Sequence, residues 1–212
     1  MIRIVIADDH AIVRAGVRAI LSTKGDVTIA AEAADGRAAL DAVAQHRPDV
    51  LVIDLTMPEL NGMEAIGRVR ALSPMTKVLV LSMHAAPEFV RPALRAGALG
   101  YVVKGAGLDD LVTAIRTVAA GERFLDAQAN ASSLNEDFEP ESADDLERLT
   151  PREREVLQLV AEGFTNREIG ERIGIAAKTV DVHRTSLMKK LDLHSAAALT
   201  RFALRRGLIS HE

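Results

Sequence analysis

Short apolar runs alternate with helix-like segments five times in the first 125 residues, and this alternation restricts the fold more than any other feature. The apolar runs, predicted to be strands, are residues 2–7, 27–33, 50–55, 78–83 and 99–103. The segments with helical spacing that follow them are residues 10–21, 36–46, 61–72, 87–96 and 108–120. Strands joined by helices favour a parallel sheet with right-handed crossovers, so we expect a five-stranded, doubly wound α/β domain.

The last 65 residues follow a different, purely helical pattern. Four helices are expected, at residues 150–162, 166–173, 177–191 and 195–206. The first begins with a hydroxyl cap at Thr150, proline at the next position and Glu153 at capping-box spacing. A tight turn separates the second and third helices, which is the arrangement of a helix-turn-helix.

The chain is predicted to have three parts, residues 1–122, 123–147 and 148–212, and its charge changes close to these boundaries. Residues 126–147 carry eight acidic and no basic side chains, which predicts a solvated acidic linker. Residues 148–212 carry 12 basic and eight acidic side chains, a net +4 that favours phosphate only weakly. The chain has no cysteine and no apolar run of about 20 residues, so we expect a cytoplasmic protein without disulfides, thiolate sites or membrane spans.

Charged and hydroxyl side chains end four of the five predicted strands: Asp8, Asp9, Asp54, Ser82 and Lys104. The carboxyl ends of parallel strands meet at one edge of a doubly wound sheet, so these side chains should form one pocket. Any one of them alone would more often be an ordinary solvated residue. Clustered carboxylates repel one another and favour a hard cation with oxygen ligands, and Mg²⁺ is the natural choice.

The pocket predicts phosphoryl chemistry on a carboxylate. Asp54 is placed to attack as the nucleophile, because it ends a buried strand and precedes a turn. Lys104 would pair with phosphoryl oxygens and Ser82 would donate a hydrogen bond to them. The metal ion would neutralise the incoming phosphoryl group.

Residues 1–122 resemble the receiver domain of two-component response regulators. The resemblance is carried by the sequences around Asp8 and Asp9, from Asp49 to Gly62, around Ser82, and from Gly100 to Lys104. It implies phosphorylation of Asp54 by a partner histidine kinase. It also implies Mg²⁺ held by Asp9, Asp54 and the backbone carbonyl of Thr56, with Asp8 contributing through water.

The same resemblance assigns roles to residues near the pocket. Ser82 and Tyr101 match the family's switch pair, in which the hydroxyl moves toward the phosphoryl group and the ring turns inward. Thr56 and His84 occupy positions that influence how fast the phosphoryl group hydrolyses. For His84, a plain surface histidine is an equally good interpretation.

The third helix of the C-terminal part is amphipathic when placed on a helical wheel. Its predicted core face holds Val180, His183, Leu187, Met188 and Leu191. The opposite face carries ammonium groups, hydroxyls and an apolar side chain, which suits phosphates and major-groove base edges. The residues expected to contact DNA are Lys178, Thr179, Val182, Thr185, Ser186 and Lys189. The roles of Asp181, at the margin of this face, and of Arg184, on the inner side, are left open.

Residues 148–209 resemble the LuxR-type helix-turn-helix of NarL/FixJ response regulators. The motifs are Leu-Thr-Pro-Arg-Glu-Arg-Glu-Val-Leu-Gln-Leu-Val-Ala-Glu-Gly, Thr-Asn-Arg-Glu-Ile-Gly, and the stretch from Thr179 to Leu191. The resemblance implies that residues 177–190 form the recognition helix and that the last helix mediates dimerisation.

Together these features predict a transcription regulator that is switched by phosphorylation and is not an enzyme in its own right. Its expected partners are DNA, a sensor histidine kinase and, once phosphorylated, a second copy of the chain; RNA polymerase is a further candidate. In the unphosphorylated state the α/β domain is expected to cover the recognition helix. The alternative, a metal-dependent phosphatase or phosphotransferase acting through an aspartyl phosphate, is disfavoured because Thr56 replaces the second aspartate of such enzymes.

Overall fold

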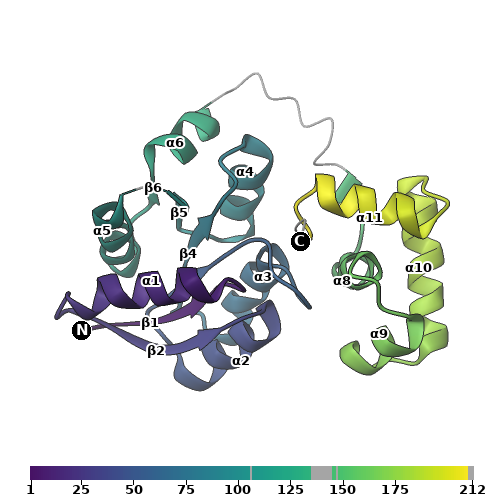
Figure 1. The fold of residues 1–212 in the computed structure, drawn as a ribbon, viewed down its shortest axis with the longest axis horizontal. Helices are drawn as coiled ribbons and strands as arrows, with labels where there is room; N and C mark the ends of the chain where they lie inside the picture. Colours follow the sequence, from purple (N-terminus) through teal and green to yellow (C-terminus); the bar gives the residue numbers. More distant parts are fainter. Residues whose placement is uncertain (106, 135–144, 147, 210–212) are drawn as a thin grey trace.

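The computed structural model describes residues 1–105, 107–134, 145–146 and 148–209, and it contains an α/β domain followed by a helical domain (Figure 1). The strands are β1 (Ile2–Ala7), β2 (Val27–Ala33), β3 (Val50–Ile53), β4 (Lys77–Ser82), β5 (Gly100–Val103) and β6 (Phe124–Leu125). They form one sheet in the order β2-β1-β3-β4-β5-β6, with every neighbouring pair parallel. The predicted doubly wound fold class is therefore confirmed.

Helices cover both faces of this sheet. They are α1 (Ala11–Ser22), α2 (Gly36–His46), α3 (Gly62–Leu72), α4 (Pro87–Ala96), α5 (Leu108–Ala119) and α6 (Ala127–Leu134). One apolar cluster joins the sheet to α1 and α5, and the other joins it to α2, α3, α4 and α6. Strand β3 is buried along its whole length between the two layers, which accounts for its continuous apolar sequence.

The sixth strand was not predicted, and the segment expected to be a linker begins with this strand and with helix α6. Strand β6 adds to the edge of the sheet beside β5, and α6 contacts α4. Asp126 fixes this segment, since its carboxylate accepts from the backbone N–H groups of Val103 and Ala129 at 2.5 and 2.7 Å. The part of the linker at residues 135–144 lies outside the described residues.

The helical domain has the four helices expected from the sequence: α8 (Pro151–Ala161), α9 (Asn166–Ile173), α10 (Ala177–Leu191) and α11 (Ala196–Arg205). They enclose an apolar core of their own. The capping box of Thr150 and Glu153 forms as predicted, and Thr165 with Glu168 forms a second one at α9. No helix in the described parts of the chain is long and apolar enough to cross a membrane.

Candidate functional site

Strand register brings the predicted pocket residues together at the carboxyl edge of the sheet. Ala7 of β1 pairs with Ile53 of β3, so the residues that follow them, Asp8 and Asp54, emerge side by side. The Asp54 N–H donates to the Ala7 carbonyl at 2.8 Å and extends this pairing by one residue. On the other side of the pocket, Val103 pairs with the last residue of β4 and directs Lys104 to the same edge.

Lys104 lies between two buried carboxylates. Its Nζ is 2.6 Å from Asp54 Oδ2 and 2.7 Å from Asp8 Oδ2. The other oxygen of Asp54 accepts from the N–H of Leu55 at 2.7 Å. Both oxygens of Asp54 therefore have defined partners. Asp54 is only 4% exposed, so most water is excluded from these contacts.

Burial and pairing shift the pKa values of these groups in defined directions. Desolvation raises the pKa of Asp54, and the Asp8 charge adds to this effect, while Lys104 opposes it. For Lys104, burial alone would lower the pKa, but the carboxylates of Asp54 and Asp8 outweigh it, so the net pKa is raised. Lys104 therefore stays cationic and neutralises part of the negative charge of the pocket.

The remaining negative charge suits a hard divalent cation. Asp8, Asp9, His10 and Asp54 each offer one ligand atom, and these atoms lie within 4.8 Å of one another. Asp8 Oδ2 and Asp9 Oδ1 are buried and have ion-pair contacts but no well-directed hydrogen bond. Carboxylate oxygens left in this state fit Mg²⁺, which prefers oxygen ligands.

Two neighbours of the pocket were missed by sequence reasoning. His10 Nδ1 lies 2.7 Å from Asp9 Oδ1 and 3.2 Å from Asp8 Oδ1; its position directly after the two aspartates was the available signal. Arg14 Nη1 donates to the backbone carbonyls of Asp8 and Asp9 at 2.6 and 3.2 Å and holds their loop in place. The spacing of Arg14 gave no such signal, because arginine on an amphipathic helix is ordinarily a solvated residue.

A glycine allows α3 to approach the pocket closely. A Cβ atom on Gly62 would lie 1.9 Å from the backbone carbonyl oxygen of Asp54, a separation that no side chain can tolerate. Gly62 N–H also donates to the Leu55 carbonyl at 2.8 Å. The helix start and the turn after Asp54 are therefore packed backbone against backbone.

The predicted switch and tuning residues lie together on the rim of the pocket. Ser82 and Tyr101 are fully buried, and the Tyr101 hydroxyl donates to the His84 carbonyl at 2.6 Å. Burial raises the pKa of Tyr101, so its hydroxyl remains protonated and serves as a donor. Thr56 Oγ1 lies 3.4 Å from His84 Nε2. The His84 ring also stacks on Phe89 of α4 with centroids 4.1 Å apart, so it is more than a plain surface histidine.

Helix α10 presents most of its predicted outer face to solvent. The exposed members of the predicted set are Lys178, Thr179, Val182, Thr185 and Lys189. Val182 is 61% exposed, which is unusual for a large apolar side chain and leaves its methyl groups free for a partner surface. On the opposite side Val180 and Leu187 are buried, as the helical wheel predicts.

Ser186 does not belong to this free face. It is half-buried, and its hydroxyl donates to Glu153 Oε1 of α8 at 2.6 Å. Lys190 Nζ lies 2.6 Å from the other oxygen of Glu153, so α10 is tied to α8 at two points. Arg184 points inward, as the wheel indicates, and Nη1 donates to Asn166 Oδ1 of α9 at 3.3 Å. The amide of Asn166 in turn donates to Asp181 at 3.2 Å.

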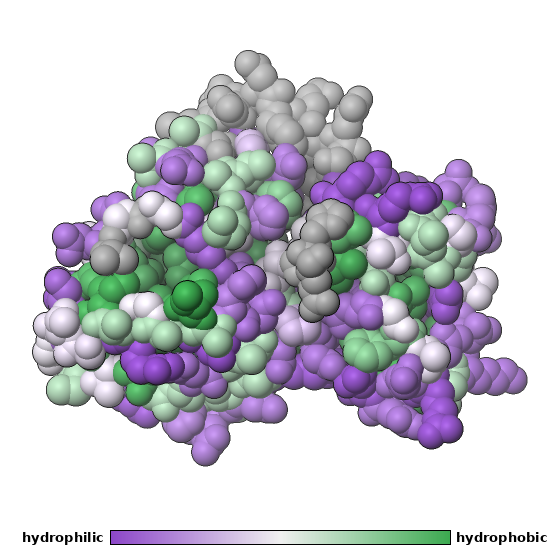
Figure 2. Space-filling view, viewed as in Figure 1, coloured by the Kyte–Doolittle hydropathy of each residue, from purple (hydrophilic) through white to green (hydrophobic). Residues whose placement is uncertain are grey.

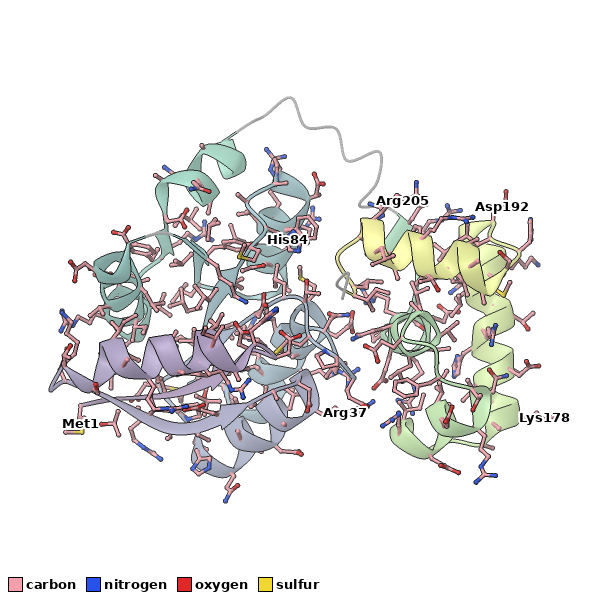
Figure 3. The ribbon with its side chains drawn as sticks, viewed as in Figure 1. Met1, Arg37, His84, Lys178, Asp192 and Arg205 are labelled. Atoms are coloured by element: carbon pink, nitrogen blue, oxygen red, sulfur yellow. The ribbon has the colours of Figure 1, made fainter. Side chains whose placement is uncertain are left out.

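The α/β domain contacts α8, the end of α11 and, through the pair of Glu59 with Arg172, α9. It leaves the outer face of α10 free, so the expectation that it covers this helix is wrong. In Figure 1, α10 lies on the side of the helical domain away from the sheet, and Figure 3 places Lys178 on that outer side. Gln158 of α8 accepts from the N–H of Asn61 at 2.8 Å and donates to the Met57 carbonyl at 2.8 Å. Both partners belong to the loop after Asp54. The helical domain is thus docked on the pocket's own loop.

Charged side chains surround this docking contact. Glu155, which is 1% exposed, pairs with Arg37 of α2 and lies 3.6 Å from Arg68 of α3. Arg154 Nε lies 2.8 Å from Glu64 Oε1 across the same seam. Figure 2 shows hydrophilic side chains along much of the boundary between the two lobes. Ion pairs therefore contribute to this interface, unlike the apolar core within each domain.

Two family models match the chain in agreement with this geometry. The model described as "Response regulator receiver domain" matches residues 4–116. The model described as "Bacterial regulatory proteins, luxR family" matches residues 147–203. The first covers the sheet with its pocket, and the second covers the helical domain up to α11.

Some relatives match this chain over nearly its whole length, so the match spans both domains. The "Oxygen regulatory protein NreC" of Staphylococcus haemolyticus is 40% identical over 214 residues, which covers 98% of this chain and 99% of that protein. Among solved structures, the RcsB response regulator of Salmonella typhimurium is 28% identical with a TM-score of 0.60, over 95% of this chain and 98% of that one. A structure of RcsB in complex with DNA matches with 28% identity and a TM-score of 0.59, over 95% of this chain and 96% of that one.

Proposed function

Because the chain belongs to the response regulators that join a receiver domain to a LuxR-type DNA-binding domain, we propose that Asp54 is its phosphoacceptor and α10 its DNA-reading helix. Transcription regulation by phosphorylation is the function of this family. The observation that carries the assignment of Asp54 is its contact with Lys104 at 2.6 Å inside a buried acidic pocket. The predicted division into a receiver at residues 1–122 and a DNA-binding domain at residues 148–212 is retained in this proposal.

In the proposed reaction, a carboxylate oxygen of Asp54 attacks the phosphorus of a phosphohistidine on a sensor kinase, and the bond from phosphorus to the histidine nitrogen breaks. Lys104 is placed to pair with the transferred phosphoryl oxygens, because it already pairs with Asp54. Asp8, Asp9, Asp54 and the carbonyl of Thr56 would hold Mg²⁺, which supplies charge neutralisation when bound. The Ser82 hydroxyl would then donate to the phosphoryl group.

The output is proposed to be DNA binding by a dimer. The exposed set on α10 supplies two ammonium groups for phosphates and the Val182 methyl groups for thymine. Ser186 is not included, because its hydroxyl is already bonded to Glu153. Dimerisation through α11 follows from the resemblance, and RNA polymerase is a further candidate partner.

The test is transfer of a phosphoryl group to the purified chain. The protein is incubated with Mg²⁺ and acetyl phosphate, and the modified residue is identified by peptide mass spectrometry after borohydride trapping. We expect one modification, on Asp54, and none in Asp54→Asn. Asp49→Asn is the matched control, because Asp49 flanks the other end of β3 and bonds the N–H of Arg3, outside the pocket.

DNA affinity provides the second measurement. Fragments selected from genomic DNA are titrated with both forms of the protein by fluorescence anisotropy. We expect beryllofluoride with Mg²⁺ to tighten binding in the unaltered chain and in Asp49→Asn, but not in Asp54→Asn. Modification at another residue, or equal affinities in all three proteins with and without beryllofluoride, would contradict the proposal.

A further inference from the structure

At the edge of the sheet, a side chain replaces the backbone as the acceptor of one strand hydrogen bond. Strand β6 lies beside β5, and Asp126, directly after β6, donates its N–H to the Tyr101 carbonyl at 3.1 Å (Figure 1). The next bond of an evenly spaced parallel ladder would run from Val103 N–H to the Asp126 carbonyl. The chain turns into α6 at this point, and that carbonyl accepts from Asn130 N–H at 2.8 Å instead.

The Asp126 carboxylate takes the place of this backbone acceptor. Its Oδ2 accepts from Val103 N–H at 2.5 Å, and its Oδ1 accepts from Ala129 N–H at 2.7 Å in the first turn of α6. Asp126 is 6% exposed, so most water is excluded from both bonds. A single side-chain oxygen is enough to cap a helix, and serine or asparagine caps one equally well. The second oxygen of Asp126 therefore has a separate role, which is to hold β5.

Val103 directly precedes the lysine of the pocket. On the side of β4, Lys104 N–H donates to the Ser82 carbonyl at 2.7 Å. On the side of β6, Val103 N–H is held by Asp126. The backbone that carries Lys104 is thus fixed from both edges of β5. The next residue, Gly105, has a φ angle of +111°, a region that favours glycine, so the strand geometry ends directly after the lysine.

The ammonium group of Lys104 has to meet two carboxylates at once. Its Nζ lies 2.6 Å from Asp54 Oδ2 and 2.7 Å from Asp8 Oδ2. A flexible four-carbon stem joins this group to the backbone, so its position depends on where the backbone starts the side chain. A displacement of the end of β5 is therefore passed on to the ammonium group.

We propose that Asp126 is a positioning residue for phosphoryl transfer: its carboxylate fixes the end of β5 and thereby sets the ammonium group of Lys104 opposite Asp54. The proposal rests on the function proposed above. A carboxylate suits this role because a charged acceptor forms a shorter and stronger hydrogen bond than a neutral one. Without it, one edge of the strand end is free, and Lys104 spends less time where the phosphoryl oxygens arrive.

The test compares Asp126→Ala with Asp35→Ala. Asp35 caps α2 through the N–H of Ala38 at 2.8 Å, as Asp126 caps α6, but it follows β2, an edge strand that carries no pocket residue. Both changes remove a helix cap from the α/β domain, and only the first removes a bond to the strand of Lys104. Asp126→Asn is the second variant, because it keeps the size of the side chain but offers one acceptor oxygen to two N–H donors. Circular dichroism and urea unfolding identify the variants that are folded under the assay conditions.

The measurement is the initial rate at which acetyl phosphate with Mg²⁺ modifies Asp54 in the full chain, followed on phosphate-affinity gels. We expect Asp126→Ala to slow this reaction about tenfold or more, since a misplacement of about 1 Å can reduce a rate by about a hundredfold. Asp126→Asn should react at an intermediate rate, and Asp35→Ala at the rate of the unaltered chain. The Mg²⁺ concentration that gives half of the maximal rate should stay the same in all four proteins, because Asp126 does not act on the metal ligands.

A double-mutant cycle shows whether the effect passes through the lysine. Lys104→Ala has no ammonium group to position, so adding Asp126→Ala to it should slow the reaction no further. The slow reactions of these two proteins are followed over longer incubations on the same gels. A purely structural effect of Asp126 would instead slow the reaction by the same factor with and without Lys104.

The outcomes separate the positioning role from the function on which it rests. If the unaltered chain is never modified at Asp54, the proposed function and the positioning role are both wrong. If Asp54 is modified but the folded Asp126 variants react at the unaltered rate, only the positioning role is wrong. Equal slowing by Asp35→Ala, or the same further slowing in the Lys104→Ala background, would also overturn it. Should Asp126→Ala not fold, the same comparisons are made with Asp126→Asn.

Discussion

Replacing Glu153 with glutamine should destabilise the DNA-binding domain strongly at neutral pH and much less in acid. The carboxylate is 4% exposed and lies 2.6 Å from both Lys190 Nζ and Ser186 Oγ. Burial alone would raise its pKa, but the hydrogen bonds from Lys190, Ser186 and Thr150 outweigh burial and lower the pKa to about 2. The charged carboxylate is therefore a stabilising feature of the folded domain.

The size of the effect follows from the difference between this pKa and the ordinary value of 4.5. That difference corresponds to about 3 kcal/mol in the free energy of unfolding. Because the folded pKa is the lower one, the stabilisation is fully present above pH 4.5 and is lost as the pH falls toward 2. The gap between the unaltered chain and Glu153→Gln should be about 3 kcal/mol at pH 7 and about 1 kcal/mol at pH 3.

Urea unfolding followed by circular dichroism at both pH values measures this gap. Glu168→Gln is the matched control, because Glu168 occupies the equivalent capping-box position of α9 and bonds Thr165, but it is exposed. Its pKa is also lowered, by the Thr165 hydroxyl first, yet water screens the charge and the loss should be much smaller. A Glu153→Gln loss at pH 7 no larger than that of Glu168→Gln, or one that does not shrink in acid, would refute the reasoning.

Three further predictions concern DNA binding, domain docking and the pocket. Lys189→Gln should weaken binding to all DNA sequences alike and reduce the slope of log affinity against log salt by about 0.9, and an unchanged slope would show that Lys189 contacts no phosphate. Glu155→Gln should loosen the seam with Arg37, seen as a larger radius of gyration in X-ray scattering at low salt; equal radii would contradict a docking role. Gly62→Ala should prevent the α/β domain from folding stably, because its Cβ would collide with the backbone of Asp54. Gly67→Ala, in open space on the same helix, should stabilise the domain by about 0.5–1 kcal/mol in thermal unfolding. Similar effects of the two changes would contradict the packing of α3 against Asp54.

The fold was predictable because each element has its own local signal. The buried strand β3 is continuously apolar, and the parallel arrangement brings Asp54 and Lys104 to one edge whatever the details of the loops. Strand β6 has only two residues, too few for any periodicity. Its position depends on Asp126, whose carboxylate bonds the backbone of β5, and in an acidic segment this aspartate resembles any other solvated one.

The docking contact could not be predicted, because its partners are far apart and chemically unremarkable. Gln158 and Asn61 are separated by 97 residues, and either could have been an ordinary surface amide. In the sequence, Gly207 indicates only the end of a helix, and the structure does end α11 there. That the same glycine fits against Phe89 is a property of the assembled chain alone. Because these contacts leave no signal in the sequence, the recognition helix α10 was predicted to face the α/β domain, whereas α8 occupies that position.

Two buried carboxylates of α8, Glu153 and Glu155, have different roles: one stabilises the DNA-binding domain itself, and the other holds this domain against the α/β domain. Glu153 is paired with Lys190 inside the domain. Loss of Lys190 would leave the carboxylate buried without a cationic partner, which lowers the stability of the fold. Glu155 is paired across the seam with Arg37 and within its own helix with Arg152, so it keeps a partner and regains water when the domains separate. Separation therefore leaves neither of these charges buried without a partner. A seam held by such ion pairs can close specifically and still open under a few kcal/mol of differential binding, as the proposed phosphorylation of Asp54 requires.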